Sequence, residues 1–280
     1  MTGFSAAWLA LREPADHAAR DPGLTADLAR ALADRDGLRV VDLGCGAGSN
    51  LRALGPHLPA EQHWCLVDHD PALLDAARAA LSHWAEAAEP AGEGLRLRVG
   101  GRRITVVFRT HDLAAGLDGL LAGERPDLVT AAALFDLVSE AWIAQAARAV
   151  AAAGAVFHTV LTYDGEEEWA PPHPADAALH AAFLAHQARD KGFGPAAGPG
   201  AGAALERNFR ALGYRTRRAP SPWRLGAGPL LDALADGKAT AAAETGLVVP
   251  ALAQAWAQSR REPGTTAAIG HVDLLAWPGA

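Results

Sequence analysis

The chain has 280 residues, half of them apolar, which is enough to bury a large core in one elaborated domain or in one domain with a modest second lobe. The formal net charge is −7 and no run of lysines and arginines exceeds two residues, so the sequence argues against a broad polyanion-binding face and against nucleic acid as a partner. The two cysteines, Cys45 and Cys65, are too few for a disulfide framework and do not form a CxxC pair.

The sequence predicts neither a signal peptide nor a membrane-spanning segment. No basic leader followed by a long apolar stretch opens the chain, and no later segment reaches 18 uncharged apolar residues. We therefore expect a cytoplasmic protein without a membrane partner.

Apolar strand-like runs alternate along the chain with alanine- and leucine-rich helical patterns. The expected strands are residues 38–43, 63–68, 104–110, 127–133, 155–161, 214–220 and 269–277. Alternation of this kind is typical of a parallel sheet covered by helices on both faces. We predict an α/β fold with a seven-stranded, mostly parallel, doubly wound sheet. A helix is expected over 71–89, and a hairpin turn at Gly100-Gly101.

Two connections are longer than those of a compact α/β domain. Residues 163–207 separate the fifth and sixth expected strands, and residues 222–263 separate the sixth and seventh. Ligands of doubly wound sheets bind beyond the carboxyl ends of the strands, where the first of these insertions begins. We therefore expect residues 163–207 to form a lid. We expect the Glu166-Glu167-Glu168 run within it to be a solvated turn, and contact with a cationic substrate is the alternative.

A glycine-rich turn follows the first expected strand in "VVDLGCGAGSN". Gly44, Gly46 and Gly48 permit positive φ angles and let backbone amides approach a ligand without obstruction by side chains. An NAD-binding fingerprint would place its third glycine where Ser49 stands. The spacing therefore predicts a cofactor other than NAD.

The stretch "VVDLGCGAG" resembles motif I of the class I S-adenosylmethionine-dependent methyltransferases. Three later stations agree in order: "CLVDHD" ends a strand at Asp68, "RTHDL" ends one at Asp112-Leu113, and "AAALFDL" follows the fourth strand. The resemblance implies S-adenosylmethionine as cofactor and S-adenosylhomocysteine as product. It covers residues 38–161 and, less closely, the last two strands.

The resemblance also implies roles for single residues. Asp68 would accept hydrogen bonds from the ribose hydroxyls, and Asp112 would receive the adenine amino group with Leu113 beside the ring. Arg20 would suit the cofactor's carboxylate, although a solvated face in which it pairs with Asp16 is an equal alternative. The full set of predicted cofactor-binding residues is Arg20, Asp42, Gly44, Cys45, Gly46, Asp68, His69, Asp112, Leu113 and Ala132.

The methyl acceptor is harder to predict. The fourth station lacks both the (Asp/Asn)-Pro-Pro-aromatic pattern of amino-group methylation and a Pro-Cys pair, and Asp136 stands alone where a metal site would need several carboxylates. We therefore expect no metal. The predicted catalytic residues are Tyr163, Asp164 and His186, and the predicted substrate-binding residues are Phe135, Asp136, Gln187, Lys191, Trp223 and Arg224.

The predicted organisation has four parts. Residues 1–37 form a helical segment over the cofactor site, 38–162 the cofactor-binding core, 163–207 the lid, and 208–280 the last two strands with the helical insertion 222–263. The predicted function is methyl transfer to a small molecule by a monomer or homodimer. A protein or nucleic-acid methyltransferase, and a non-catalytic sensor that binds S-adenosylmethionine or its product, are the alternatives.

Overall fold

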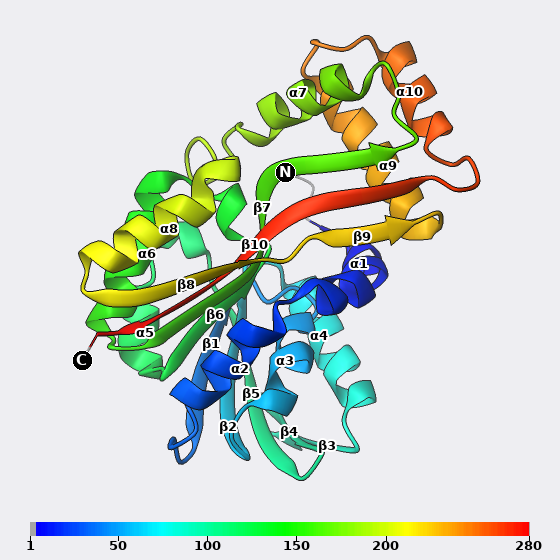
Figure 1. The fold of residues 1–280 in the computed structure, drawn as a ribbon. Helices are drawn as coiled ribbons and strands as arrows, with labels where there is room; N and C mark the ends of the chain where they lie inside the picture. Colours follow the sequence, from blue (N-terminus) through cyan, green and yellow to red (C-terminus); the bar gives the residue numbers. More distant parts are fainter. Residues whose placement is uncertain (1–3, 280) are drawn as a thin grey trace.

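The computed structural model describes residues 4–279, which form one sheet flanked by helices (Figure 1). The strands are β1 (Leu38–Leu43), β2 (Glu61–Asp68), β3 (Ala87–Ala91), β4 (Gly94–Val99), β5 (Arg102–Thr110), β6 (Leu128–Ala132), β7 (Val156–Ala170), β8 (Tyr214–Pro220), β9 (Trp223–Gly226) and β10 (Thr266–Pro278). The longer helices are α1 (Ala6–Ala19), α2 (Pro22–Ala31), α3 (Ser49–Leu54), α4 (Pro71–Trp84), α5 (Asp118–Glu124), α6 (Glu140–Ala152), α7 (Asp176–Gln187), α8 (Ala201–Ala211), α9 (Pro229–Glu244) and α10 (Pro250–Ser259).

The strand order is β3-β4-β5-β2-β1-β6-β7-β10-β8, and β9 also pairs with β10. Strands β5, β2, β1, β6 and β7 run parallel, whereas β10 is antiparallel to both of its long neighbours, β7 and β8. These seven strands confirm the predicted α/β fold. The Gly100-Gly101 hairpin is also confirmed, since both glycines have positive φ between the antiparallel β4 and β5.

The predicted helix over 71–89 was wrong at its end. Helix α4 stops at Trp84, and the chain continues into β3, which pairs with β4. Leu73, Leu74, Ala77 and Leu81 form the buried stripe of α4. Beyond that stripe no further core residue holds a helix, so the backbone hydrogen bonds of residues 87–91 go to a strand instead.

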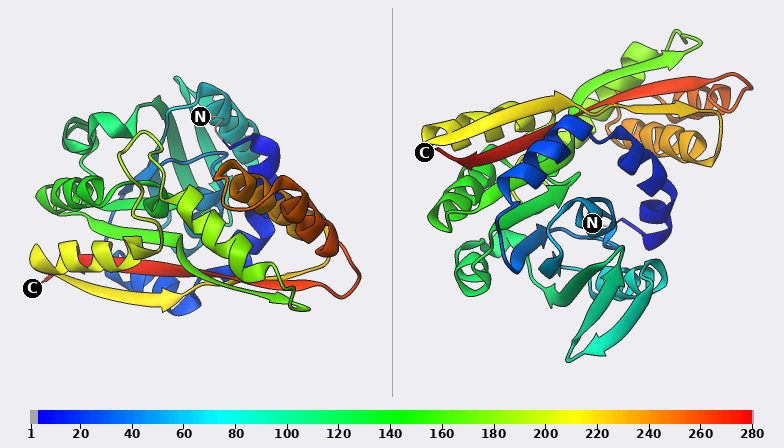
Figure 2. Two further views of the ribbon diagram at one scale, coloured as in Figure 1. Left: turned by 90° about the horizontal axis from the view of Figure 1, so that it is seen from above. Right: turned by 60° about the horizontal axis from the view of Figure 1, so that its bottom comes forward.

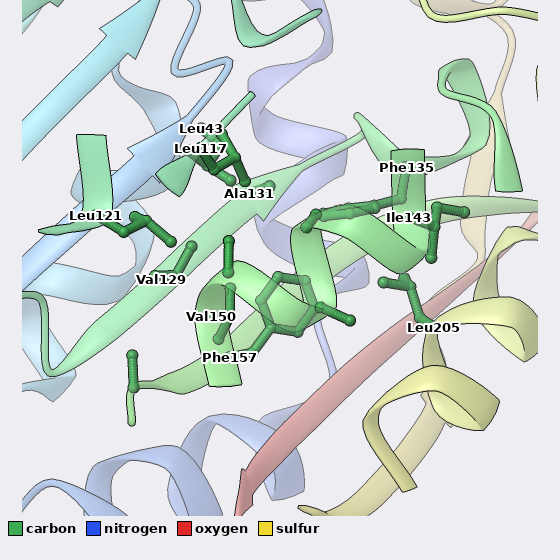
Figure 3. Packing of buried hydrophobic residues seen from close by; sticks show 14 of the residues in the cluster. Leu43, Leu117, Leu121, Val129, Ala131, Phe135, Ile143, Val150, Phe157 and Leu205 are labelled. Carbon is green, nitrogen blue, oxygen red and sulfur yellow. The ribbon is translucent and has the colours of Figure 1, made fainter. Parts of the chain in front are cut away.

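Each face of the sheet covers a core. On one face, β1, β2, β4 and β5 pack against α2, α3 and α4. On the other, β6 and β7 pack against α5, α6 and α8, with Phe135 and Phe157 edge to face at 5.3 Å (Figure 3). Complete burial of one such side chain contributes about 1.5–3 kcal/mol.

A third core belongs to a second lobe. Strands β7 and β10 run on past the other strands, and with β9 they carry α7, α9 and α10 (Figure 1). We call these strand ends and helices the second lobe. Trp169 of β7 packs edge to face on Trp256 of α10, with ring centroids 4.9 Å apart.

Among the helices of residues 4–279, none combines the length and the apolar composition that a membrane span requires.

Glu167 differs from the solvated turn predicted for residues 166–168. The run lies in β7, and the Glu167 side chain is 6% exposed. It forms ion pairs with Lys238 of α9 and His180 of α7, and it accepts a hydrogen bond of 2.7 Å from the Trp169 indole. Glu167 therefore fastens two helices of the second lobe to β7.

Candidate functional site

The glycine-rich turn lies between β1 and α3. Gly44, Gly46 and Gly48 have φ angles of 64°, 52° and 75°. A Cβ atom on Gly46 would lie 2.9 Å from Leu9 of α1. The turn therefore needs glycine both for its backbone conformation and for its contact with α1.

Asp68 is held at the end of β2. Its Oδ2 accepts a hydrogen bond of 2.9 Å from the Gly46 amide, and its Oδ1 accepts one of 3.0 Å from the Asp70 amide. The residue is only 5% exposed. The carboxylate is thus oriented by the neighbouring backbone.

A buried polar chain runs behind the turn from Asp42 through Asn50 to Arg20. The Asn50 side chain donates a hydrogen bond of 2.8 Å to the Asp42 carboxylate and accepts one of 2.9 Å from Arg20 Nη1. Burial raises the pKa of Asp42 to about 7, although Asn50 and Arg20 favour its ionised form. Two atoms of this chain, Arg20 Nε and Asp42 Oδ2, have no partner among the described residues.

The alternative in which Asp16 pairs with Arg20 differs from the structure. Asp16 instead accepts hydrogen bonds from Arg12 at 2.9 Å and from the Trp223 indole at 3.0 Å. Trp223 belongs to β9, so this buried carboxylate joins α1 to the second lobe. Figure 2 shows α1 next to the second lobe. Arg20 Nε therefore has no acceptor among the residues that the structure describes.

A cavity of about 1080 Å³ lies between the turn and the second lobe. Its walls come from α1, the glycine turn, the ends of β2 and β6, the segment after β5, the segment after α7, and α9. The residues lining it are Phe4, Leu9, Arg12, Asp16, Arg20, Gly44, Cys45, Gly46, Ala47, Ser49, Asn50, Asp68, His69, Leu73, Asp112, Leu113, Ala114, Ala132, Ala133, Leu134, Leu137, His186, Arg189, Asp190, Lys191, Gly192, Phe193, Gly237, Thr240, Ala241 and Glu244.

The structure brings most of the predicted cofactor set together. Arg20, Gly44, Cys45, Gly46, Asp68, His69, Asp112, Leu113 and Ala132 all line the cavity, and Asp42 lies behind them. Burial raises the pKa of the Cys45 thiol well above its ordinary value, which keeps it protonated and supports a packing role.

The predicted acceptor set is divided. His186 and Lys191 line the cavity, but Phe135 points into the core, where Figure 3 shows it beside Ile143. A short 3₁₀ turn after β6 turns Leu134 and Leu137 to the cavity and Phe135 away. Asp136 is buried next to it, and burial raises its pKa to about 6.

Tyr163 and Asp164 do not line the cavity. Tyr163 lies in the core of the second lobe, its hydroxyl 3.4 Å from Glu167, and burial raises its pKa. Asp164 binds the Glu166 amide of its own strand at 2.9 Å. Both residues belong to the extension of β7, which carries them past the cavity.

Three other predicted substrate residues also lie off the cavity wall. Trp223 lies behind Asp16, in the third core. Arg224 is exposed next to it, because successive residues of β9 face opposite sides. Gln187 is partly buried at the end of α7, with Oε1 unpartnered among the described residues.

Helix α9 supplies a wall that the sequence did not reveal. Gly237, Thr240, Ala241 and Glu244 recur at helical spacing and line the cavity. Glu244 accepts a hydrogen bond of 3.0 Å from His186 Nε2, so it orients the imidazole. The small residues of this face were hidden among the many alanines of the helix.

Strain accompanies the site at the end of β6. Ala133 lines the cavity with a φ of 51°, and its amide donates to the Val160 carbonyl at 2.9 Å. A non-glycine residue in this region of φ costs about 1–3 kcal/mol, and such residues concentrate at functional sites.

Within residues 4–279 no group of three or more His, Cys, Asp or Glu side chains is arranged to hold a metal ion.

A protein-family model described as a methyltransferase domain matches residues 16–193. The chain belongs to this family. It is a class I methyltransferase, and its methyl donor is S-adenosylmethionine. The matched span includes the glycine turn, all the cofactor stations and the cavity-lining residues 189–193 after α7. No curated protein matches the sequence.

Three solved structures are similar to this methyltransferase, and the first of them shares its fold. A cyclopropane-fatty-acyl-phospholipid synthase-like protein from Lactobacillus casei superposes with a TM-score of 0.53 at 15% identity, over 95% of this chain and 92% of that chain. A SAM-dependent methyltransferase from Geobacter sulfurreducens in complex with S-adenosylhomocysteine has a TM-score of 0.46 at 15% identity, over 98% of this chain and 99% of that chain. A SAM-dependent methyltransferase from Thiobacillus denitrificans, also in complex with S-adenosylhomocysteine, has a TM-score of 0.45 at 17% identity, over 98% of this chain and 99% of that chain.

Proposed function

We propose that this methyltransferase transfers its methyl group to a small molecule enclosed between the glycine turn and the second lobe. The observation that carries the proposal is the cavity of about 1080 Å³. Sites for a single small ligand usually measure about 300–1,000 Å³, so this cavity has room for an acceptor beside the cofactor. Walls from α1, α7 and α9 favour a small acceptor over a protein or nucleic acid.

The residues of the turn fit the cofactor. Gly44 and Gly46 expose backbone to the cavity, and a side chain at Gly46 would meet Leu9. Asp68 and Asp112 offer acceptors for ribose hydroxyls and for the adenine amino group. Arg20 lines the same cavity, and its guanidinium suits the carboxylate of the cofactor. When bound, the cofactor supplies a methyl group already activated by positively charged sulfur.

The acceptor side combines an apolar floor with charged walls. Leu134 and Leu137 lie at the end of β6, where they exclude water, and Lys191 faces the same cavity from the segment after α7. His186, oriented by Glu244, is the residue we assign to removing a proton from the acceptor. We no longer propose Tyr163 and Asp164 as catalytic residues, because they do not line the cavity.

A cavity-filling substitution tests the enclosed acceptor site. Gly237 lies in α9 with open space where a Cβ would stand. The substitution Gly237→Trp is expected to lower turnover by at least about tenfold, because a displaced acceptor loses alignment with the methyl group. Calorimetry should show an unchanged affinity for S-adenosylhomocysteine, and Gly237→Ala should behave like wild type. Normal turnover in a folded Gly237→Trp protein would exclude this site.

Asp42 is expected to lose part of a proton when the cofactor binds. Its pKa of about 7 lies above that of an unfolded aspartate, so stability falls as pH rises from the ordinary aspartate range towards 7. The net positive charge of S-adenosylmethionine favours the ionised carboxylate, so binding near pH 7 is expected to release part of a proton. Calorimetry in two buffers of different ionisation enthalpy measures this release. Asp42→Asn should abolish it; proton uptake by wild type would contradict the assignment.

NAD and NADP are expected not to bind appreciably. Ser49 stands where the dinucleotide fingerprint has its third glycine, and its hydroxyl is bonded to His17 of α1 at 2.9 Å. Titration of the apoprotein with NAD is the check, and S-adenosylhomocysteine is the positive control. Micromolar NAD affinity would overturn the cofactor assignment for this turn.

A further inference from the structure

The sheet has a solvent-exposed basic face on β4, β5, β2 and the start of β1, on the side opposite α4. Cross-strand register places Arg39 beside His63, His63 beside Thr105, and Thr105 beside Arg96. Directly paired residues point to the same face of a sheet. The basic sheet face comprises Arg39, Glu61, His63, Glu89, Arg96, Arg98, Arg103, Thr105, Val107 and Arg109.

The opposite side of the same strands is ordinary core. Trp64, Leu97, Ile104 and Val106 are buried there against α4. On the basic side, α5 covers Val41 and Cys65, and the cover ends before β4. Val107 is 40% exposed, and the arginines beside it are exposed as well. Figure 1 shows β3, β4 and β5 at the lower edge of the sheet.

Positive charge is in excess on this face. Arg103 pairs with Glu61, and Arg109 pairs with Glu124 at 2.6 Å. Arg96 and Arg98 form no ion pair with any of the residues 4–279. Five arginines and His63 thus gather on one side of a chain whose formal net charge is −7.

A hollow of about 180 Å³ adjoins the arginines. Its lining includes Val41, Cys65, Val107 and Pro126, with Arg39 and Glu124 at the rim. An apolar cavity of about 150 Å³ can hold a benzene ring, so this hollow has room for one large apolar side chain. The face therefore has an apolar hollow beside an excess of arginines.

We propose that the basic sheet face docks an acidic protein segment, in which Asp and Glu residues flank one large apolar side chain. The arginines complement the carboxylates, and the hollow takes the apolar residue. Nucleic acid fits less well, because the face offers no Phe, Tyr or Trp for stacking and intersperses three glutamates among its cations. This docking site is independent of the methyl-transfer proposal.

The test uses the whole protein and a fluorescein-labelled peptide of glutamates with one central leucine. Anisotropy is expected to show binding that weakens with added salt. The glutamine analogue should not bind. Arg96→Glu/Arg98→Glu should weaken binding by at least about tenfold, because it replaces two attractive charges by two charges that repel the acidic peptide. The matched control, Arg148→Glu/Arg207→Glu, changes exposed arginines on α6 and α8 and should bind like wild type.

Other outcomes would overturn the proposal. These are no peptide binding by wild type, equal binding by Arg96→Glu/Arg98→Glu, or tighter binding of single-stranded RNA or anionic vesicles through the same arginines. Calorimetry of S-adenosylhomocysteine runs in parallel on the same variants. Its affinity should stay unchanged, so a failure of this docking site is distinguishable from a failure of the cofactor site.

Discussion

Replacing Glu167 by alanine is expected to lower the free energy of unfolding by about 3–5 kcal/mol, because it removes one partner of a buried ion pair. Lys238 is 4% exposed and would keep an ammonium group without its anion. The Trp169 indole would lose its acceptor at the same time. Urea denaturation followed by tryptophan fluorescence measures the change, since Trp169 and Trp256 report on the second lobe.

The matched control is Glu168→Ala, which changes an exposed neighbour and should stay within about 0.5 kcal/mol of wild type. Burial alone would raise the pKa of Glu167, but Lys238, Trp169 and His180 together hold it below its ordinary value. The contribution of Glu167 is therefore present above the ordinary glutamate range and is lost as pH falls through the depressed pKa. Equal stability of the two variants, or a Glu167→Ala protein that gains stability, would show that this ion pair does not support the second lobe.

Replacing Asp68 by alanine is expected to weaken S-adenosylhomocysteine binding by about 1.5–3 kcal/mol, the value of hydrogen bonds to a charged group. That difference is roughly 10- to 150-fold in affinity. The carboxylate has two independent backbone partners in the free protein, from Gly46 and Asp70, so it is already oriented before a ligand arrives. Isothermal calorimetry measures the loss.

Asp75→Ala is the control for Asp68, because it removes an exposed carboxylate of α4 that does not line the cavity. Its affinity should remain close to that of wild type. Circular dichroism confirms that both variants are folded. An Asp68→Ala protein that is folded and binds S-adenosylhomocysteine normally would remove this carboxylate from the cofactor site.

Local signals made the sheet and the glycine turn predictable. Strand β1 occupies the predicted residues 38–43, because an apolar run bounded by a turn signal needs no tertiary information. The glycines of the turn adopt the positive φ angles that their spacing indicated. Asp68 and Asp112 line the cavity because the carboxyl ends of parallel strands meet at one edge.

Tertiary context decided what the sequence could not show. Charge alone suggested a solvated Glu167, but Lys238 and His180 come from helices distant in the chain. The strand at 155–161 was expected to end before Tyr163, and its continuation to Ala170 carries that residue past the cavity. Pairing with β10 extends the strand, and no local pattern encodes that pairing.

The basic sheet face has the same origin. Its arginines occupy alternate positions on several strands, so no run of basic residues marks them in the sequence. Cross-strand register then brings Arg39, Arg96 and Arg103 to one side. The expectation that the chain lacks a broad basic face rested on the net charge and on the short runs of basic residues, and neither shows how residues in strands are distributed over the faces of a sheet.

The destination of the methyl group tests the proposed function most directly. The full-length protein is incubated with S-adenosylmethionine labelled in its methyl group and with a cell extract divided by dialysis into small molecules and retained macromolecules. We expect label in the dialysable fraction, formed together with S-adenosylhomocysteine, and a marked loss of both with Gly237→Trp. Label found only in retained protein or nucleic acid, or cofactor binding without any turnover, would contradict methyl transfer to an enclosed small molecule.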